Sequence, residues 1–426
     1  MSRNSVYYGL LLGILLLLSQ NTVGAQMNKM PIEVRVQTIE KLSQMLGELY
    51  VNPEIGKKMV KQLKANLKNG KYDKIENFHQ FAMVIKQDLF DISKDNHLNI
   101  YYNPQQVGYL KKLKDASMQE KNDFALKEKM NESKNNFGFE AVKILPGNIG
   151  YIQLTTFANS QYAGDTAAAA MNFISNTDSV IIDLRYNNGG WPSMAQLLAS
   201  YFFEYNESGN TVLFEQHITY SKEIIAYATL PIVVGKRMPN VPLYILVNKS
   251  SISAAEGFAY CLQKLGRATV IGEQTNFGGH STRGPEILND YFVVQMPVGN
   301  IISPITQKGW EGTGVTPDIL TESRDAVNTA VKIVLAKQIV KNPDENSVND
   351  LGYSLLVRGS MELAIFVFGE NVKNHPQSAN VYDSLGEVYM QTGNKDLAIQ
   401  NYERSLQLNP KNTGAEENLK KLKDMK

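Results

Sequence analysis

Apolar residues recur at two different periods along the chain, and the change of period divides it into regions. Between residues 28 and 94 they recur every three or four positions, at 36, 39, 42, 45, 46 and 49 and again across 78–90. This spacing is typical of amphipathic helices. A polar, charged stretch over 115–136 follows. We therefore expect residues 28–140 to form a helical N-terminal subdomain and a linker.

The region 141–325 instead alternates short apolar runs with helical patterns. The runs predict strands at 148–157, 179–185, 241–247, 268–273 and 291–299, and the patterns predict helices at 165–176 and 192–204. The β-branched run from Val180 to Ile182 is bounded by polar residues, as in a strand buried on both faces. Such alternation indicates a layered α/β domain.

The last region, 346–426, contains an internal repeat. Leu351-Gly352, Gly359, Ala364, Phe368 and Pro376 return as Leu385-Gly386, Gly393, Ala398, Tyr402 and Pro410, each 34 positions later. The period and residue types resemble the tetratricopeptide repeat, which has two helices per unit. Two units are few, and a helix over 415–423 is expected to cap the second. The unit could dock a protein partner or could serve stability alone as a helical hairpin.

Residues 1–25 have the pattern of a secretory signal peptide. Arg3 supplies a positive start, 7–18 are almost entirely apolar, and Val23-Gly24-Ala25 fits the small-residue cleavage rule. We expect removal after Ala25, a periplasmic or secreted protein, and no stable membrane insertion after cleavage; an uncleaved anchor is the alternative.

Composition excludes several classes of function. The net charge is +1 over 426 residues, with no basic-aromatic stripe, so nucleic acid is not expected as a partner. The single cysteine, Cys261, excludes an intrachain disulfide and should be a buried small hydrophobe. No Cys or His cluster has metal-ligand spacing, so neither a metal nor a cofactor is expected.

Two segments carry candidate chemistry. DSVIIDLRYNNGG, 178–190, ends in a glycine pair, and LVNKSSISAAE, 246–256, brings Ser253 to a helix start. First-turn amides there are unpaired and can bind a developing oxyanion. A simpler interpretation is a capping box between Ser253 and Glu256, which stabilises a helix by about 1 kcal/mol without catalysis. The glycine pair taken alone is equally compatible with a turn.

Four motifs in order resemble the tail-specific (C-terminal processing) protease superfamily. They are DLRYNNGG, NKSSISAAEGFAY, TVIGEQTNFGGHSTRG and PITQKGWEGTGVTPDI, within a region of about 30–325. The match is closest to the branch of interphotoreceptor retinoid-binding protein and the tricorn core protease. This resemblance implies a layered ββα, crotonase- and ClpP-like core in residues 141–325. It also implies that Ser253 is the nucleophile.

The resemblance also suggests which residue is the base. Bacterial tail-specific proteases use a lysine in the loop where this chain has Gly278 and Gly279, so a Ser-Lys dyad is not expected. The tricorn-like branch uses a histidine and a glutamate. His97, in a DxHxxV-like element, is then the general base, with Glu311 orienting its imidazole. Either could instead be an ordinary surface or core residue, and His280 is the competing base. With an unperturbed histidine base, the rate should rise through about pH 6 to 7.

The remaining site residues follow from the same comparison. Gly190 and Ala254 are the candidate oxyanion donors, with Gly189 shaping the turn. His280, Gly189 and Trp191 are candidates for the substrate pocket, and Trp191 stands where many relatives have a small residue. Asp183 and Arg185 are expected to form an internal ion pair that holds the loop.

These features predict a secreted serine endopeptidase that hydrolyses peptide bonds of polypeptide substrates through a Ser-His-Glu acyl-enzyme mechanism. The tetratricopeptide unit would supply a possible protein partner. The alternative is a catalytically inactive binding protein of the retinoid-binding type, for apolar ligands or peptides.

Overall fold

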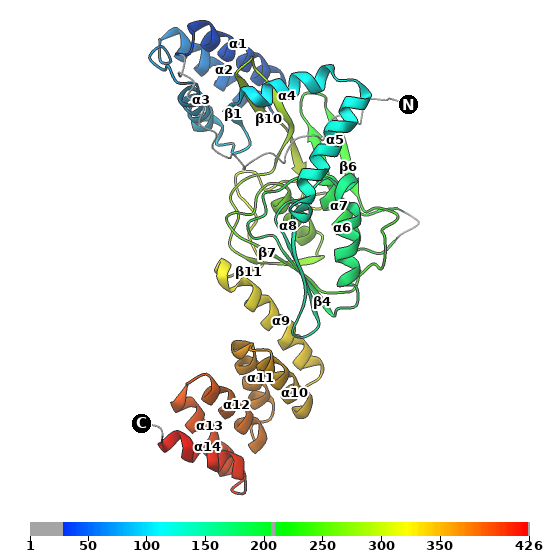
Figure 1. Cartoon of the computed structure of the whole chain (residues 1–426), viewed down its shortest axis with the longest axis vertical. Helices are drawn as coiled ribbons and strands as arrows, with labels where there is room; N and C mark the ends of the chain where they lie inside the picture. The colour runs from blue at the N-terminus through cyan, green and yellow to red at the C-terminus, as the bar shows by residue number, and fades with distance from the viewer. Residues whose placement is uncertain (1–28, 206–208, 425–426) are drawn as a thin grey trace. The chain divides into compact units, whose positions relative to one another are not determined.

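A computed structural model describes residues 29–205 and 209–424 of the chain (Figure 1). The described residues form two compact units. One contains the chain up to Lys143 with Tyr151–Asn176 and Ile182–Ser323; the other contains Ile144–Gly150, Thr177–Ile181 and the chain from Arg324 onward. The predicted signal peptide lies outside the described residues, and the predicted domain boundaries stay predictions. Within the described residues no helix is both long and apolar enough to cross a membrane.

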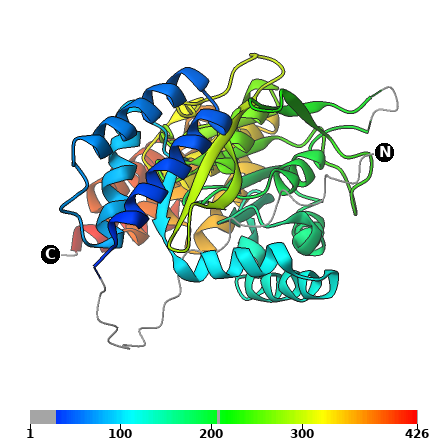
Figure 2. The ribbon, with the colours of Figure 1, turned by 90° about the horizontal axis from the view of Figure 1, so that it is seen from above.

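Three helices open the first unit, and the three-and-four spacing predicts the first and the third of them. They are α1 (Ile32–Leu49), α2 (Pro53–Lys68) and α3 (Phe78–Ser93). Asn52 and Asn77 cap α2 and α3 by accepting hydrogen bonds from first-turn amides. The apolar faces pack on one strand, β10, whose Phe292 and Val294 are fully buried among them. Figure 2 shows these helices, in blue, beside the yellow-green strand.

A five-stranded sheet receives these helices. β10 (Phe292–Ile302) lies at its centre and pairs antiparallel with three strands; the order is β1-β10-β5-β6, with β9 also paired to β10. The other members are β1 (Asn99–Tyr102), β5 (Val212–Ile218), β6 (Glu223–Ala228) and β9 (His280–Ile287). Of these strands the sequence predicts only β10; β6 and β9 contain no buried residue and so show no alternation of buried and exposed side chains.

The predicted α/β core is confirmed in a second sheet with the order β11-β8-β7-β4-β3-β2. All five residues of β4 (Ser179–Asp183) and of β7 (Leu243–Val247) are buried, as the β-branched run predicts for β4. Strand β7 pairs with β8 in parallel. The remaining strands are β2 (Phe139–Leu145), β3 (Ile149–Leu154), β8 (Ala268–Gly272) and β11 (Ile319–Leu320).

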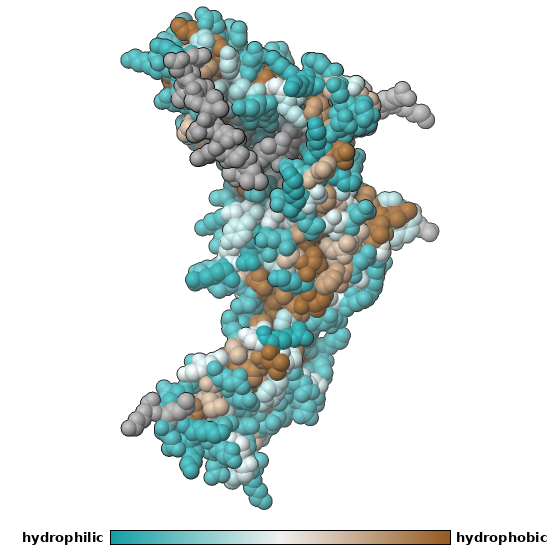
Figure 3. Space-filling view, viewed as in Figure 1, coloured by the Kyte–Doolittle hydropathy of each residue, from teal (hydrophilic) through white to brown (hydrophobic). Residues whose placement is uncertain are grey.

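Helices α6 (Ser160–Phe173), α7 (Pro192–Ser200) and α8 (Ala254–Lys264) complete the core. Cys261 lies fully buried in α8, and burial raises the pKa of its thiol to about 12, which confirms it as a small hydrophobe. Figure 3 shows hydrophobic residues gathered around the part of the core where Figure 1 places α6. Phe173, the last residue of α6, is 59% exposed.

The polar stretch expected to be a linker is largely helical. It follows α4 (Pro104–Asp115) and contains α5 (Met118–Ser133), which has no buried residue. Ser117 and Glu120 form a capping box at the start of α5. A cap and exposed charged residues can therefore define a helix where no apolar stripe predicts one. A single 3₁₀ turn, Asn136–Gly138, leads from there to β2.

The second unit contains the repeat. After a 3₁₀ turn at Ser323–Asp325, its helices are α9 (Ala326–Lys341), α10 (Glu345–Val357), α11 (Met361–Asn374), α12 (Ala379–Gln391), α13 (Lys395–Leu408) and α14 (Thr413–Asp424). A Cβ on Gly352 would lie 2.4 Å from the Phe368 ring, and one on Gly386 would lie 3.1 Å from Tyr402. The small residues of each repeat thus permit close helix packing, and α14 packs as the predicted cap.

Candidate active site

Ser253 stands where β7 has ended and α8 begins, in a strained backbone conformation. Its φ is 54° and its ψ is −111°, a region that a residue with a Cβ rarely adopts. Such strain costs about 1–3 kcal/mol and persists only where the surrounding structure imposes it. A sharp strand-to-helix turn of this kind exposes a nucleophile in other hydrolases. The hydroxyl therefore has the local setting expected of a nucleophile.

Glu256 holds this turn from inside. Its side chain is fully buried, and its Oε2 accepts hydrogen bonds from the Ser253 amide at 2.9 Å and the Gly278 amide at 3.1 Å. Its Oε1 accepts from the Phe277 amide at 3.2 Å. The glutamate side of the predicted capping box is thus present, but the same carboxylate also binds the 277–278 loop. Burial raises the pKa of Glu256, although hydrogen bonds to Thr275 and three amides oppose this.

The glycine pair lies against Ser253. A Cβ on Gly189 would come within 2.9 Å of the Ser253 Cβ, and one on Gly190 within 2.1 Å of the Phe157 carbonyl oxygen. Both glycines also have positive φ, 79° and 138°. Only glycine fits such positions without a shift of the backbone. Buried Asn187 fixes the loop: it donates to the Leu154 carbonyl and accepts from the Gly189 amide.

The amides of the candidate oxyanion donors, Gly190 and Ala254, donate no hydrogen bond within the described part of the chain, whereas the neighbouring amides of Gly189 and Trp191 do. Their role as oxyanion donors stays a prediction. Trp191 is the N-cap of α7. The predicted Asp183 and Arg185 pair is confirmed, with Nη2 and Oδ2 2.7 Å apart.

His97 is buried without a hydrogen-bond partner. The residue is 5% exposed, neither ring nitrogen has a partner, and the ring packs edge-on against Phe277 with centroids 4.6 Å apart. Burial lowers the pKa of His97 to about 4; Asp95 opposes this shift and His280 adds to it. The expectation of an unperturbed pKa is therefore wrong, because desolvation disfavours the imidazolium.

Glu311 contacts a different histidine from the one expected. Its Oε2 accepts from the amides of Gly279 at 2.6 Å and His280 at 3.1 Å, and lies 3.6 Å from the His280 Nδ1. No hydrogen bond between Glu311 and His97 occurs among the described residues. The His280 Nδ1 also lies 2.8 Å from the Asp95 Oδ2. The assigned role of Glu311 toward His97 thus stays a prediction.

Asp95, His280 and Glu311 are also the residues best placed to hold a metal ion in this part of the structure. Their ligand atoms all lie within 4.8 Å of one another. The same atoms already form hydrogen bonds and ion pairs with each other and with backbone amides. Their proximity is therefore explained without a metal, and the expectation of none stays a prediction.

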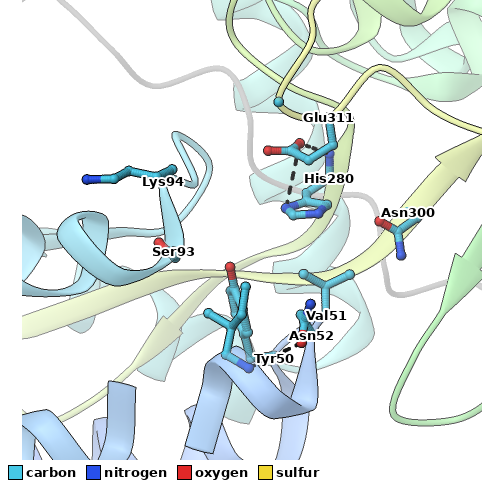
Figure 4. Close-up of a pocket in the computed structure, with 10 residues that line it drawn as sticks. Tyr50, Val51, Asn52, Ser93, Lys94, His280, Asn300 and Glu311 are labelled. Carbon is cyan, nitrogen blue, oxygen red and sulfur yellow. Dashed lines mark hydrogen bonds and ion pairs between the residues drawn. The ribbon is translucent and has the colours of Figure 1, made fainter. Parts of the chain in front are cut away.

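Two cavities adjoin this cluster. One, of about 270 Å³, is lined by residues including Tyr50, Lys94, His280 and Glu311, and the other, of about 380 Å³, by residues including Asn96 and Phe277. Figure 4 shows His280 and Glu311 side by side, with the Tyr50 hydroxyl pointing toward them. His280 thus lines the first of these cavities, while its assignment to the substrate pocket stays a prediction. Ser253, Gly189 and Trp191 line neither cavity.

Several residues of this region carry no clear sequence signal. Tyr50 ends an ordinary helix, and Asn187 stands in a polar loop. Asp95 could have been noticed only as the first position of the DxHxxV-like element. Asn96 donates to the Phe277 carbonyl at 2.9 Å and so connects the His97 loop to the 277–278 loop.

Three regions of the chain match known families. Residues 148–321 match peptidase family S41, residues 33–138 match the N-terminal domain of peptidase S41 in eukaryotic IRBP, and residues 379–412 match a tetratricopeptide repeat. The first two matches together contain Ser253, His97 and Glu311.

Individual relatives carry related names. The chain is 29% identical over 172 residues to the carboxyl-terminal-processing peptidase 3, chloroplastic, of Arabidopsis thaliana, covering 40% of this chain and 31% of that protein. It is 29% identical over 189 residues to a carboxy-terminal-processing protease of Bartonella bacilliformis, covering 43% and 41%. The chain thus spans less than half the length of these two relatives. A solved photosystem II D1 C-terminal processing protease is 16% identical, with a TM-score of 0.44 over 69% of this chain and 94% of that one.

The two S41 matches follow each other along the chain and precede the repeat, in the order that the sequence predicts. The chain belongs to the tail-specific (C-terminal processing) protease superfamily, peptidase family S41, and carries a C-terminal tetratricopeptide repeat.

Proposed function

We propose that the protein is a serine endopeptidase that cleaves polypeptides through an acyl-enzyme at Ser253. The observation that carries this proposal is the strained backbone of Ser253 at a strand-to-helix turn, packed against the glycine pair. Strain of this kind marks functional positions because it has no benefit for stability. Family membership supports the same chemistry, and the names of the processing-protease relatives suggest cleavage near a chain's C-terminus.

The reaction proceeds by acyl transfer. His97 removes the Ser253 hydroxyl proton as the Ser253 Oγ bonds to the scissile carbonyl carbon. The amides of Gly190 and Ala254 donate to the resulting oxyanion. The C–N bond then breaks, and His97 returns the proton to the leaving amine. Water, activated by the same histidine, hydrolyses the ester. Glu311 contributes negative charge behind His280.

A catalytically silent carrier of apolar ligands is the alternative. An apolar carrier needs a mainly hydrophobic pocket. The smaller cavity has the apolar lining residues Val51 and Ile55 beside the charged Lys94 and Glu311, so its lining does not separate the two functions. The strained turn at Ser253, which a carrier does not need, favours the peptidase.

Labelling with a fluorophosphonate probe tests the proposal directly. The purified protein, starting after Ala25, should become covalently labelled at Ser253, because the probe reacts only with an activated serine hydroxyl. Peptide mass spectrometry locates the label, and Ser250 in the same loop is the internal control. Labelling of neither serine would favour the silent carrier.

The dependence of kcat/KM on pH should reflect the buried base. Because the neutral imidazole accepts the proton, kcat/KM should rise as pH rises through the His97 pKa, which burial lowers to about 4. Activity should therefore already be near its plateau at pH 6. A half-maximal rate between about pH 6 and 7 would mean a solvated base, and a rise only above about pH 9 would indicate a lysine.

The export signal and the repeat complete the proposal: the protein acts in the periplasm or outside the cell, and the tetratricopeptide unit docks a protein partner. A chain ending at Asn342, the C-cap of α9, should still cleave a small unstructured peptide within a few-fold of the full-chain rate. Cleavage of a protein substrate should fall much further. If small-peptide hydrolysis disappears while circular dichroism shows a folded protein, the repeat completes the active site instead.

A further inference from the structure

One buried carboxylate connects the groups around the candidate base. Asp95 is 1% exposed, and its Oδ2 accepts from the Tyr50 hydroxyl at 2.9 Å and lies 2.8 Å from the His280 Nδ1. Its Oδ1 accepts from the His97 amide at 2.8 Å and lies 4.0 Å from the His97 Nδ1. Asp95 is thus the acidic side chain with a recorded contact to the His97 imidazole among the described residues.

Glu311 reaches the same network only at its far side. Its recorded partners are the Gly279 amide and the amide and ring of His280. Within the described residues Glu311 therefore makes no direct contact with the His97 imidazole.

We propose that Asp95, rather than Glu311, is the carboxylate that orients and stabilises the His97 imidazolium, and that Tyr50 and His280 hold Asp95 in place. This inference rests on the proposed function, since it assigns a positioning residue to the same base. Asp95 must move only about 1 Å to hydrogen-bond the His97 Nδ1. Catalytic hydrogen bonds are often long until substrate binds.

The charges of the network fit this role. Burial alone raises the pKa of Asp95, but the hydrogen bond and charge of His280, with a smaller effect of His97, hold it below its usual value. Burial lowers the pKa of His280, but Asp95 and then Glu311 raise it overall. Asp95 therefore stays an anion at neutral pH. A buried anion beside the base is what a transient imidazolium requires.

The titratable groups packed around His97 have opposite effects on it. Tyr50 ends α1, Asp95 shares the His97 loop, His280 begins β9, Glu311 lies behind His280, and Glu256 binds the loop of Phe277. Asp95 raises the His97 pKa and His280 lowers it. On the acidic side of the pH profile kcat/KM falls as His97 becomes protonated; we call this the acidic limb. Removing the Asp95 charge should move the acidic limb to lower pH, and removing the His280 charge should move it to higher pH.

Single variants of the otherwise full chain test the proposal. Asp95→Asn should lower plateau kcat/KM by about 10³ to 10⁴-fold and move the acidic limb to lower pH. His280→Gln should move the limb to higher pH. Glu311→Gln should lower kcat/KM less than Asp95→Asn does, and Tyr50→Phe, which keeps the charge, should lower it by less than about tenfold. Glu215→Gln is the matched control, because Glu215 pairs with His217 at 2.7 Å elsewhere in this unit; it should change neither rate nor limb.

Three results would overturn the proposal. The first is a larger loss of kcat/KM for Glu311→Gln than for Asp95→Asn. The second is a kcat/KM for Asp95→Asn within tenfold of the parent value. The third is a lower plateau for Asp95→Asn with an unmoved acidic limb, which indicates a purely structural role. If Asp95→Asn does not fold by circular dichroism, the double variant Tyr50→Phe with His280→Gln must still lower kcat, and an unchanged kcat rejects the proposal. Full activity in Ser253→Ala would instead reject the proposed function itself.

Discussion

Alanine at Ser253 or at His97 should lower peptidase turnover by about 10⁴-fold or more, and the double variant should be little worse than either single one. The reason is that the nucleophile and its base act in one proton transfer, so removing either abolishes the same step. The measurement is kcat on a small peptide for the parent, both single variants and the double variant. Circular dichroism should show the same fold for all four.

Ser250→Ala is the matched control for this experiment. Ser250 lies three residues earlier in the same loop and is exposed, so its removal should leave turnover within about twofold. Losses that add in free energy would mean that Ser253 and His97 serve separate steps. Equal activity of Ser253→Ala and the parent would exclude an acyl-enzyme at this serine.

Alanine at Gly190 should lower kcat by about 10² to 10³-fold, the usual loss of one oxyanion donor. The added Cβ would lie 2.1 Å from the Phe157 carbonyl oxygen, so the Gly190 segment must move and its amide leaves the oxyanion position. KM should change far less than kcat, because the oxyanion forms only in the transition state. Steady-state kinetics on a peptide substrate separate the two constants.

Gly266→Ala separates this effect from backbone strain. Gly266 also has a positive φ, 68°, but a Cβ there would meet no atom within 4 Å. The variant should lose about 1–2 kcal/mol of stability while keeping its turnover. If both glycine variants lose kcat equally, general destabilisation explains the loss and Gly190 is no donor.

Local patterns in the sequence were sufficient for much of the fold. The three-and-four spacing predicts α1 and α3, because a helix buried on one face needs apolar residues at that spacing. The β-branched run predicts β4, because a strand buried on both faces needs consecutive apolar residues. The turn at Ser253 and the glycine pair are local as well. The repeat is visible because Gly352 and Gly386 each pack under an aromatic ring 16 positions later.

Other parts of the fold depend on pairing between distant segments. Strands β5, β6 and β9 are partly exposed and have irregular patterns, so they are defined by β10 and by each other. The helix α5 has no buried residue, and its start depends on the Ser117 cap. The sequences of such strands show little apolar periodicity, because each strand is defined by its hydrogen bonds to a neighbouring strand that can be distant in sequence.

For the candidate site, the sequence by itself determined which residue types are available: a serine at a helix start, a glycine pair, two histidines and a glutamate in recognisable motifs. Only the tertiary structure decided how they pair. Asp95 and His280 stand 185 positions apart, yet their side chains touch, and Glu311 contacts His280 instead of His97. Burial likewise lowers the pKa of His97 to about 4. Ion pairing depends on the distance between side chains, and desolvation depends on how far solvent is excluded. The spacing of residues along the chain determines neither of them.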